Sequence, residues 1–291
     1  MKHSTIRRAG LLALAGSFLL PLGMVQAARP AAGSVLLRYR FAQGDTYSYK
    51  VVAKLAIGGA DTSSGGGSLA ADALAVVFGA RGPLTISGTV RYHVLSVDTS
   101  GTATVEISTS NLTRTTVKKG KIVSTTLQAT LPYTVQIGAD GSQQGSSTID
   151  MGALGLTALG RLPSAPVAPG SHWPVAATLA LPADLGLLLP PVQVPVTYTF
   201  SKVQAAGSQQ AAVIDGTGPV QYVLDASSGD APINASFSGT MTEHVLYGLT
   251  THRFVSGQAT VDTLATLGKR RALGLRRPVR VTMAVTMQAI R

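Results

Sequence analysis

The sequence predicts an all-β protein whose framework is a strongly curved antiparallel sheet or open barrel. Segments in both halves of the chain alternate apolar with polar residues, which places one face of each strand in a core and the other in water. Short turns containing Gly and Asp separate these segments, and Thr and Ser, which suit pleated strands with one wet face, are dense within them. We therefore expect about a dozen strands, counted by alternation, in two similar halves joined by a Pro/Leu-rich seam.

The region 1–27 has the features of an export signal. Basic residues (Lys2, Arg7 and Arg8) precede an apolar run over 9–25, and Ala27 ends a small-residue cleavage site. We expect cleavage after Ala27, export to the periplasm or the cell exterior, and a mature chain of 264 residues (291 − 27). The alternative is an uncleaved membrane anchor, for which the run is slightly short. Because no Cys follows the run, we expect no lipid-modified N-terminus.

Composition excludes several kinds of chemistry. The chain has no cysteine, so thiol catalysis, thiolate metal sites and iron–sulfur clusters are ruled out. It carries 24 Lys and Arg against 13 Asp and Glu, and three of the basic residues lie in the expected signal, so the mature net charge is +8 (21 − 13). This charge favours acidic partners such as anionic lipid headgroups, wall polymers or nucleic acid. We find no second segment long and apolar enough for a transmembrane helix.

The first predicted β half covers 28–147. Alternation over 35–41 predicts a half-buried strand with an arginine-bearing outer face, which forms a hairpin with a second strand over 46–57. A Gly/Ser-rich loop over 58–83 interrupts the pattern, and its apolar part, 69–78, is interpreted as a short helix on the sheet or a hydrophobic flap. Three or four further strands follow before a Gly/Ser-rich link ends this half.

The seam covers 148–195. A small apolar stretch over 151–162 is interpreted as a short helix, and 176–195 as an irregular apolar cover over a sheet face, because its prolines forbid a continuous helix or central strand. Between them, 161–175 holds four of the fifteen prolines and the only Trp. Trp173 is too large and apolar for a free linker, so we expect it buried against the strands, with both halves packed as one domain. The residues expected to shape the seam are Pro163, Pro166, Gly170 and Trp173.

The second β half, 196–291, repeats the alternating pattern and ends in two long strands expected to form a hairpin. Six positions recur between the halves at a constant offset of 106 residues (196 − 90), without a gap. This regularity predicts an internal duplication, and the alternative is a chance likeness between two amphipathic hairpins. The matched pairs are Val90 and Val196, Tyr92 and Tyr198, Val94 and Phe200, Val97 and Val203, Gly101 and Gly207, and Ile107 and Val213.

Two motifs stand at the start and the middle of the mature chain, YRFxxGDTYSY and LPxxPVxxGxxW. Their residues here are Tyr39, Phe41, Gly44, Tyr47 and Tyr49, then Pro163, Pro166, Val167, Gly170 and Trp173. In this pairing the chain resembles an uncharacterised all-β family of bacterial exported, lipoprotein-like proteins. The resemblance implies a β-rich envelope protein and brings no activity with it. Members are often lipoproteins, a feature that does not carry over because this chain lacks the cysteine.

Motifs for enzymatic chemistry are absent from the sequence. There is no Gly-x-Ser-x-Gly elbow, and the Gly-rich SSGGGS loop has no Lys-Ser/Thr after it to bind phosphate. Glu106 and Glu243 are the only glutamates and lie in different halves, which disfavours a glycosidase carboxylate pair. We expect no cofactor and no catalytic residue.

One weak metal site can be drawn from the sequence. If the chain turns at 247–249, His244 and His252 lie opposite each other with Glu243 beside one of them, and two imidazoles and a carboxylate can hold zinc. The alternative is a pair of strand histidines facing solvent, so we predict no metal.

A basic stretch lies near the C-terminus, after the last acidic residue, Asp262. If 260–267 pairs with 278–290, six cations crowd one hairpin end, where they can anchor the protein to anionic lipid, lipopolysaccharide or wall polymer. The alternative is a charged loop that keeps a sheet edge from aggregating. Nucleic acid is not expected, because no aromatic residue interleaves the cluster. The six residues are Lys269, Arg270, Arg271, Arg276, Arg277 and Arg280.

Together these features predict a non-enzymatic exported protein of the cell envelope that binds a hydrophobic or anionic ligand. The first alternative is a structural or interaction protein whose β core is filled. The second is a hydrolase with an unfamiliar site, which needs a concave cluster containing His244, His252 or an Asp.

Overall fold

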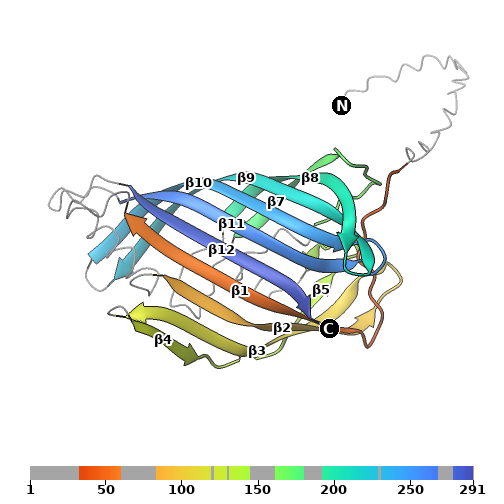
Figure 1. Cartoon of the computed structure of the whole chain (residues 1–291), viewed down its shortest axis with the longest axis horizontal. Helices are drawn as coiled ribbons and strands as arrows, with labels where there is room; N and C mark the ends of the chain where they lie inside the picture. The colour runs from red at the N-terminus through yellow and green to blue at the C-terminus, as the bar shows by residue number, and fades with distance from the viewer. Residues whose placement is uncertain are drawn as a thin grey trace, which may run out of the picture.

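The computed structural model describes residues 33–59, 83–118, 121–129, 131–144, 161–179, 192–228, 231–267 and 278–290, and the regular structure there is all β (Figure 1). The strands are β1 (Thr46–Gly59), β2 (Leu84–Val97), β3 (Ala103–Lys118), β4 (Lys121–Thr126), β5 (Tyr133–Ile137), β6 (Gln143–Gln144), β7 (His172–Leu179), β8 (Val192–Ala206), β9 (Gln209–Ser228), β10 (Ala231–Gly248), β11 (Arg253–Leu267) and β12 (Val279–Ile290). The predicted all-β class is confirmed.

Some predicted features lie outside the described residues: the export signal, the helix or flap at 69–78, and the helix over 151–162 except for its last two residues. In the part of the chain that is described, no helix has the length and apolar character to cross a bilayer.

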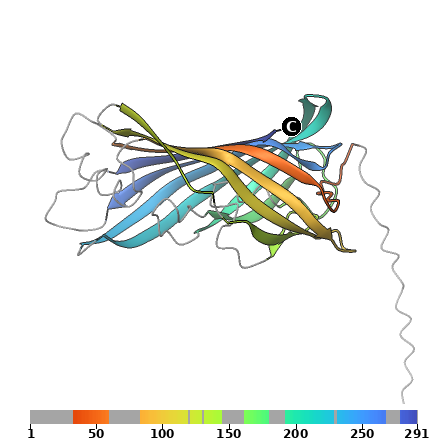
Figure 2. The ribbon, with the colours of Figure 1, turned by 90° about the horizontal axis from the view of Figure 1, so that it is seen from below.

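The strands form one antiparallel sheet that is open. Its order is β6-β5-β3-β2-β1-β12-β11-β10-β9-β8-β7, with β4 attached to β3 beside this path. β1 and β12 pair from Ser48↔Ile290 to Gly59↔Val279, so strands of both predicted halves lie in the same sheet. Figure 2 shows how strongly the sheet curves. The predicted curved, open antiparallel sheet is confirmed.

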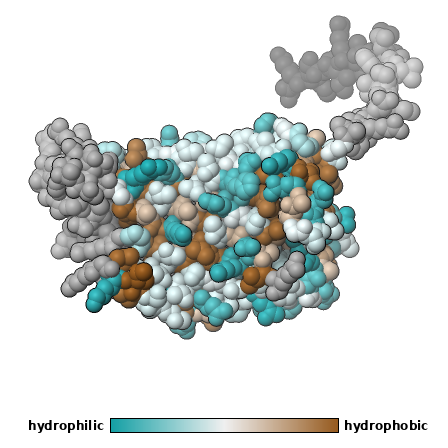
Figure 3. Space-filling view, in the orientation of Figure 1, coloured by the Kyte–Doolittle hydropathy of each residue, from teal (hydrophilic) through white to brown (hydrophobic). Residues whose placement is uncertain are grey.

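The two faces of the sheet differ because successive side chains point to opposite sides of a strand. In β8, Val194, Val196 and Tyr198 are buried, whereas the intervening Gln193 and Thr197 are exposed. The buried set faces the concave side and forms the core. The outer surface seen in Figure 3 mixes hydrophilic and hydrophobic patches over β1, β11 and β12.

The predicted strand over 35–41 is not a strand of the sheet. Its bridge, Val35↔Val167, joins it to the seam, and the N–H of Tyr39 donates to the carbonyl of Ala139 (2.8 Å). The segment 33–45 therefore crosses the end of the sheet where β1 begins (Figure 1). Alternation predicted burial correctly, since Leu37 is fully buried, but it does not reveal which segment accepts the backbone hydrogen bonds.

The predicted irregular cover over 176–195 is wrong at both ends, because β7 runs to Leu179 and β8 starts at Val192. Two prolines are placed within these strands. Pro174 lies in β7, which ends the sheet path, and an edge strand tolerates a missing N–H. Pro195 lies in β8, where a side chain at Gly218 would collide with its carbonyl oxygen, so the close approach of β9 requires glycine there.

The two hairpins linked by the offset of 106 have matching local geometry. The β2–β3 pair has a bulge between Val94 and Ser96, and the β8–β9 pair has one between Phe200 and Lys202, 106 residues further on. The turn glycines, Gly101 and Gly207, both have positive φ, at 84° and 62°. Shared bulges and turns do not establish a common origin, so the internal duplication stays a prediction.

The prediction that Trp173 is buried is confirmed. Its side chain is 9% exposed and stacks on Tyr198, with ring centroids 5.8 Å apart. Its indole N–H donates to the carbonyl of Arg161 (3.3 Å), which ties β7 to the start of the described seam. The seam therefore packs on the sheet at this point.

Candidate functional site

Glu243 is the one buried carboxylate among the residues whose side chains the structure describes, 4% exposed on the concave face of β10. Met241, Val245 and Tyr247 share this face because they lie at even spacings from Glu243 on the strand, and all three are buried. A carboxylate in such surroundings is costly unless it is paired or protonated. It is therefore the first place to look for function.

Tyr198 reaches Glu243 across an intervening strand. The sheet register places Tyr198 beside Gly216 and Gly216 beside Glu243. A Cβ at Gly216 would lie 2.5 Å from Cε1 of Tyr198, so the missing side chain makes the space in which the ring lies. The phenol donates a hydrogen bond of 2.5 Å to Glu243 Oε2.

The second oxygen of this carboxylate, Glu243 Oε1, is buried and has no hydrogen-bond partner. Burial raises the pKa of Glu243 from 4.5 to about 7, and the hydrogen bond from Tyr198 opposes the shift. The group therefore changes its charge close to neutral pH. Its Oε2 accepts the hydrogen bond from Tyr198, and its Oε1 can accept a hydrogen bond from a further partner.

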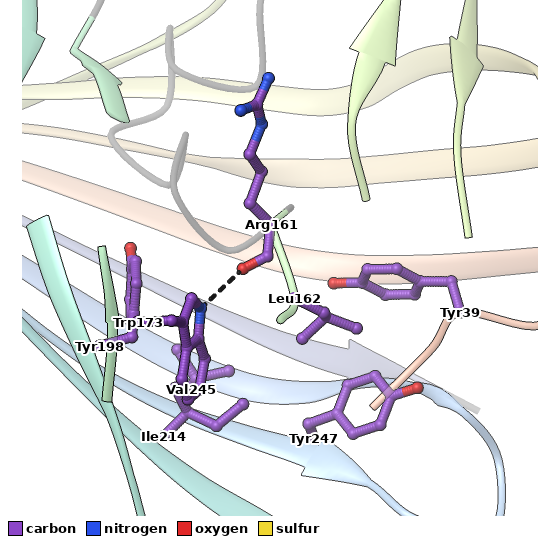
Figure 4. A pocket seen from close by; sticks show the side chains of 8 residues that line it. All are labelled: Tyr39, Arg161, Leu162, Trp173, Tyr198, Ile214, Val245 and Tyr247. Carbon is purple, nitrogen blue, oxygen red and sulfur yellow. Dashed lines mark hydrogen bonds between the residues drawn. The ribbon is translucent and has the colours of Figure 1, made fainter. Parts of the chain in front are cut away.

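A small pocket of about 10 Å³, room for about one water molecule, lies between the seam and the sheet, and of the pair Tyr198 lines it while Glu243 does not (Figure 4). Leu162 covers it, and Arg161 turns its guanidinium away from the rings while its carbonyl faces Trp173. The residues that complete the lining are Tyr39, Trp173, Tyr198, Ile214, Val245 and Tyr247.

The phenols around the pocket are neutral at physiological pH. Burial is the largest cause that raises the pKa values of Tyr198, Tyr39 and Tyr247 above that of a free phenol. The Tyr39 and Tyr247 rings meet edge to face with centroids 5.7 Å apart, and Tyr247 donates to the carbonyl of Arg38. The pocket wall is thus aromatic and aliphatic, with Glu243 as the charge-bearing group behind it.

The metal-site geometry drawn from the sequence is wrong. β10 ends at Gly248 and β11 starts at Arg253, so the turn is longer than predicted and His244 lies opposite Gln258. His252 is in the turn itself, with a φ of 52°. Glu243 and His244 are consecutive in a strand and face opposite sides of the sheet. In the described part of the chain, no three His, Asp or Glu side chains are grouped closely enough to hold a metal.

His244 instead forms a polar group on the convex face, where its Nδ1 lies 2.7 Å from Asp215 Oδ1. Ser201 donates to the other oxygen of Asp215. Burial raises the pKa of Asp215, but the hydrogen bonds from Ser201 and His244 outweigh it and leave the pKa lowered. Because Ser201 contacts the carboxylate and not the imidazole, the group lacks the nucleophile–base contact of a hydrolase.

Of the six predicted basic residues, Lys269, Arg270, Arg271, Arg276 and Arg277 lie outside the described residues. The strands that flank them, β11 and β12, do pair as predicted. Arg280 is exposed and forms a two-point ion pair with Asp262, with Nε donating to Oδ1 at 2.8 Å and a terminal nitrogen to Oδ2. Its charge is matched within the sheet, so it is not a free cation for an anionic surface.

The four predicted seam residues differ in their burial and in the contacts that they make. Pro163 is buried and Pro166 is exposed. Gly170 has a φ of 92°, which favours glycine, and its N–H donates to the carbonyl of Phe200 on β8 (2.7 Å). Trp173 lines the pocket, so only one of the four predicted seam residues contributes a side chain to it.

The Tyr198–Glu243 pair was not predicted as a site. The signal in the sequence is the segment MTEHVLYG, where Glu243 falls on the apolar face with Met241, Val245 and Tyr247. An acidic residue at an inward position of a strictly alternating strand is unusual, because buried charges need partners. The partner itself could not be inferred, since it depends on the register of β8, β9 and β10.

Comparison with known proteins adds no family to this description. No protein-family model matches the chain, and no curated protein is detectably similar to it in sequence. The likeness to a bacterial exported family therefore stays a prediction from its two motifs.

Proposed function

We propose that this protein is an exported, non-enzymatic binding protein of the cell envelope that holds an apolar ligand on the concave face of its open sheet. The observation that carries the proposal is the break in the sheet between β6 and β7, which leaves one apolar concave face beneath irregular chain. Curved β sheets with apolar interiors are suited to hydrophobic ligands. The comparison rests on fold-level analogy, so the site has to be tested directly.

The chain that covers this opening is attached by isolated hydrogen bonds. Val35 and Val167 exchange two bonds of 2.8 Å, which join its two segments to each other, and Gly170 and Ser171 exchange backbone hydrogen bonds with Phe200 on β8. By contrast, β9 and β10 pair residue by residue along the whole of β10. The cover thus lies outside the regular ladders of the sheet, and a ligand that enters beneath it has to displace buried side chains such as Leu37 and Trp173.

Small residues on the concave face support the same conclusion. In the row that crosses the sheet at Glu243, the neighbouring strands contribute Gly216, Ala259 and, further along, Ala53. The Tyr198 ring occupies the space above Gly216, so the part of this row that we propose for a bound molecule lies over Ala259 and Ala53. An apolar ligand fits this row because aliphatic and aromatic side chains flank it.

Native mass spectrometry after gentle purification from cells tests the proposal. We expect a bound apolar molecule that is extractable with organic solvent. Ala53→Leu and Ala259→Leu, which fill the concave row, should each reduce the bound fraction, while Ala56→Leu on the exposed face of β1 should not. Thermal unfolding of each variant verifies that it is folded. A folded wild-type protein that yields no extractable ligand and binds no apolar probe would contradict the proposal.

A structural or interaction protein with a filled core is the second candidate, and one observation favours it. At the end of the sheet where 33–45 crosses, the aromatic rings are in direct contact and the pocket beside them holds about 10 Å³. This candidate predicts no extractable ligand and a protein partner recovered by crosslinking in cells.

The basic stretch 269–277 is proposed to meet an anionic envelope surface, such as lipid headgroups or lipopolysaccharide. Replacing its five cations by Gln should reduce cosedimentation with vesicles that contain anionic lipid. Arg280→Gln should have little effect, because Arg280 is paired with Asp262. Equal sedimentation of the wild type and all variants would contradict the proposal that 269–277 binds an anionic surface.

Export is proposed from the region 1–27. Fractionation of expressing cells, followed by N-terminal sequencing, should give a mature protein that starts at Ala28. A full-length chain retained in the cytoplasm would contradict both export and the envelope assignment.

A further inference from the structure

We propose that Glu243 anchors the head group of the bound ligand and that this head group is a protonated amine. The inference rests on the proposed function, since it names the polar end of a ligand whose apolar part lies on the concave face. It assigns a charge-recognition role to the Tyr198–Glu243 pair.

The first support is the unpaired oxygen. Glu243 is 4% exposed, Tyr198 occupies Oε2, and Oε1 is buried with no hydrogen-bond partner. Buried polar atoms of this kind are rare, because an unmade hydrogen bond leaves the cost of desolvation uncompensated. A ligand that donates to Oε1 completes the site. The pocket of about 10 Å³ lies next to this carboxylate, because Tyr198, which donates to Oε2, and Val245, two positions along the same face of β10, both line it, and an ammonium nitrogen is close in size to the water molecule that it can hold.

The second support is the nature of the surrounding groups. The register partners of Glu243 on the neighbouring strands are Gly216 and Ala259, and Tyr198 reaches it across Gly216; none of these three residues carries a charge. Trp173 stacks on Tyr198, and the ring faces of such a pair attract cations. Among the described residues, Arg161 is the only arginine that lines the pocket, and its guanidinium points away from the rings (Figure 4). The pocket therefore has aromatic walls with a carboxylate behind them, and no described residue that lines it directs a positive charge inward.

These groups distinguish an amine from other head groups. A carboxylate or phosphate ligand would be repelled by ionised Glu243 and would meet no cation in the pocket. A hydroxyl could donate to Oε1, but it would forgo the charge-assisted hydrogen bond, which is roughly twice as strong as a neutral one. The protonated amine is the head group that uses both the carboxylate and the rings.

The charge state of Glu243 gives the inference a pH signature. Burial raises its pKa to about 7 in the free protein, while the neighbouring phenols of Tyr198, Tyr39 and Tyr247 stay protonated. An alkyl amine is protonated throughout this range. Its binding should therefore tighten as the pH rises through about 7 and Glu243 ionises.

Three matched probes with twelve-carbon chains test the inference: dodecylamine, dodecanol and dodecanoate. Binding to the full mature chain is measured by titration calorimetry at about pH 6 and about pH 8. We expect dodecylamine to bind about tenfold or more tightly than dodecanol at the higher pH. Glu243→Gln should remove this preference and its pH dependence while leaving dodecanol affinity within about twofold. Glu106→Gln, the same change at the other glutamate, should leave all values unaltered.

The outcomes separate the two proposals. If all three probes bind equally and Glu243→Gln changes none of them, the concave face binds apolar chains, but Glu243 holds a buried water only and the amine inference is overturned. If dodecanoate binds best, the charge assignment is wrong. If no probe binds to the folded protein, the proposed function fails and the inference fails with it.

Discussion

The hydroxyl of Tyr198 donates a 2.5 Å hydrogen bond to Glu243 Oε2 across the bare backbone of Gly216. Three adjacent strands each supply one member of this arrangement: an aromatic donor, a residue without a side chain, and a buried acid. Because the three residues contact one another, a substitution at any of them should change the stability of the folded protein.

Stability should fall as the pH rises through the titration of Glu243. The folded pKa of about 7 lies above the value of 4.5 for the exposed group, so the folded state holds its proton more tightly than the unfolded state. The stabilisation of the folded state by protonated Glu243 is fully present below about pH 4.5 and is lost as the pH rises through about 7. A difference of about 2.5 pKa units corresponds to about 3 kcal/mol in the free energy of unfolding. Urea unfolding at about pH 5 and about pH 8 measures it.

Glu243→Gln is the matched variant for this pH profile. It keeps the size of the side chain and removes the titration, so its free energy of unfolding should lack this component of the pH dependence and exceed that of the wild type at about pH 8. A wild-type protein whose stability has the same pH profile as Glu243→Gln would show that Glu243 titrates at its ordinary pKa.

Tyr198→Phe should destabilise the protein at about pH 8 by about 1–3 kcal/mol, because it removes the donor to a buried carboxylate. It should also raise the pKa of Glu243 further, since the hydrogen bond from Tyr198 is the interaction that lowers it. Chemical unfolding across pH gives both quantities. Tyr222→Phe is the control, because that ring stacks on Phe237 with centroids 4.3 Å apart and its change should stay within about 0.5 kcal/mol. An equal loss in both variants would count against a special role for the Tyr198 hydroxyl.

Gly216→Ala should cost about 1–3 kcal/mol through overpacking, because the new methyl would lie 2.5 Å from the Tyr198 ring. The ring has to move, which should also disturb the hydrogen bond to Glu243. Gly58→Ala on β1 is the matched change, since a Cβ there meets nothing within 4 Å. Thermal unfolding of the two variants compares them, and a Gly216→Ala protein as stable as Gly58→Ala would show that the ring lies elsewhere.

Trp173 should report on the docking of the seam. It is the only Trp in the chain and is buried against Tyr198, so its emission should be blue-shifted in the folded protein and shift to longer wavelength on unfolding. Trp173→Ala should cost about 3–5 kcal/mol, whereas Trp173→Phe, which keeps a ring on Tyr198, should cost less. Emission already at the wavelength of a solvated indole in the native protein would contradict this packing.

Most of the fold class could be predicted from alternation. The inward residues of β8 and β10 recur at every second position, as in Val194, Val196 and Tyr198, and this period of two identifies a strand with one buried face. The burial of Trp173 followed from its size and apolar character. Alternation also led to the wrong prediction for 35–41, because an extended segment that covers a sheet has the same alternating pattern as a strand within it.

The candidate site could not be predicted to the same extent. Glu243 was considered in the sequence with Glu106 as a carboxylate pair and beside His244 as a metal ligand, although Glu243 and His244 point to opposite faces of the sheet. Arg280 was counted with a basic cluster, although Asp262 on the adjacent strand pairs with it. Both errors concern neighbours across strands, which are fixed by register.

The sequence alone therefore determines that this protein is a one-face-buried β protein without cysteine chemistry, because periodicity and composition act within single strands. Only the tertiary structure decides that Tyr198, Gly216 and Glu243 lie in one row and that the chain at 33–45 and 161–171 covers the open end. Those relationships depend on hydrogen-bond register between strands far apart in sequence, where a shift of one residue would turn every side chain to the opposite face.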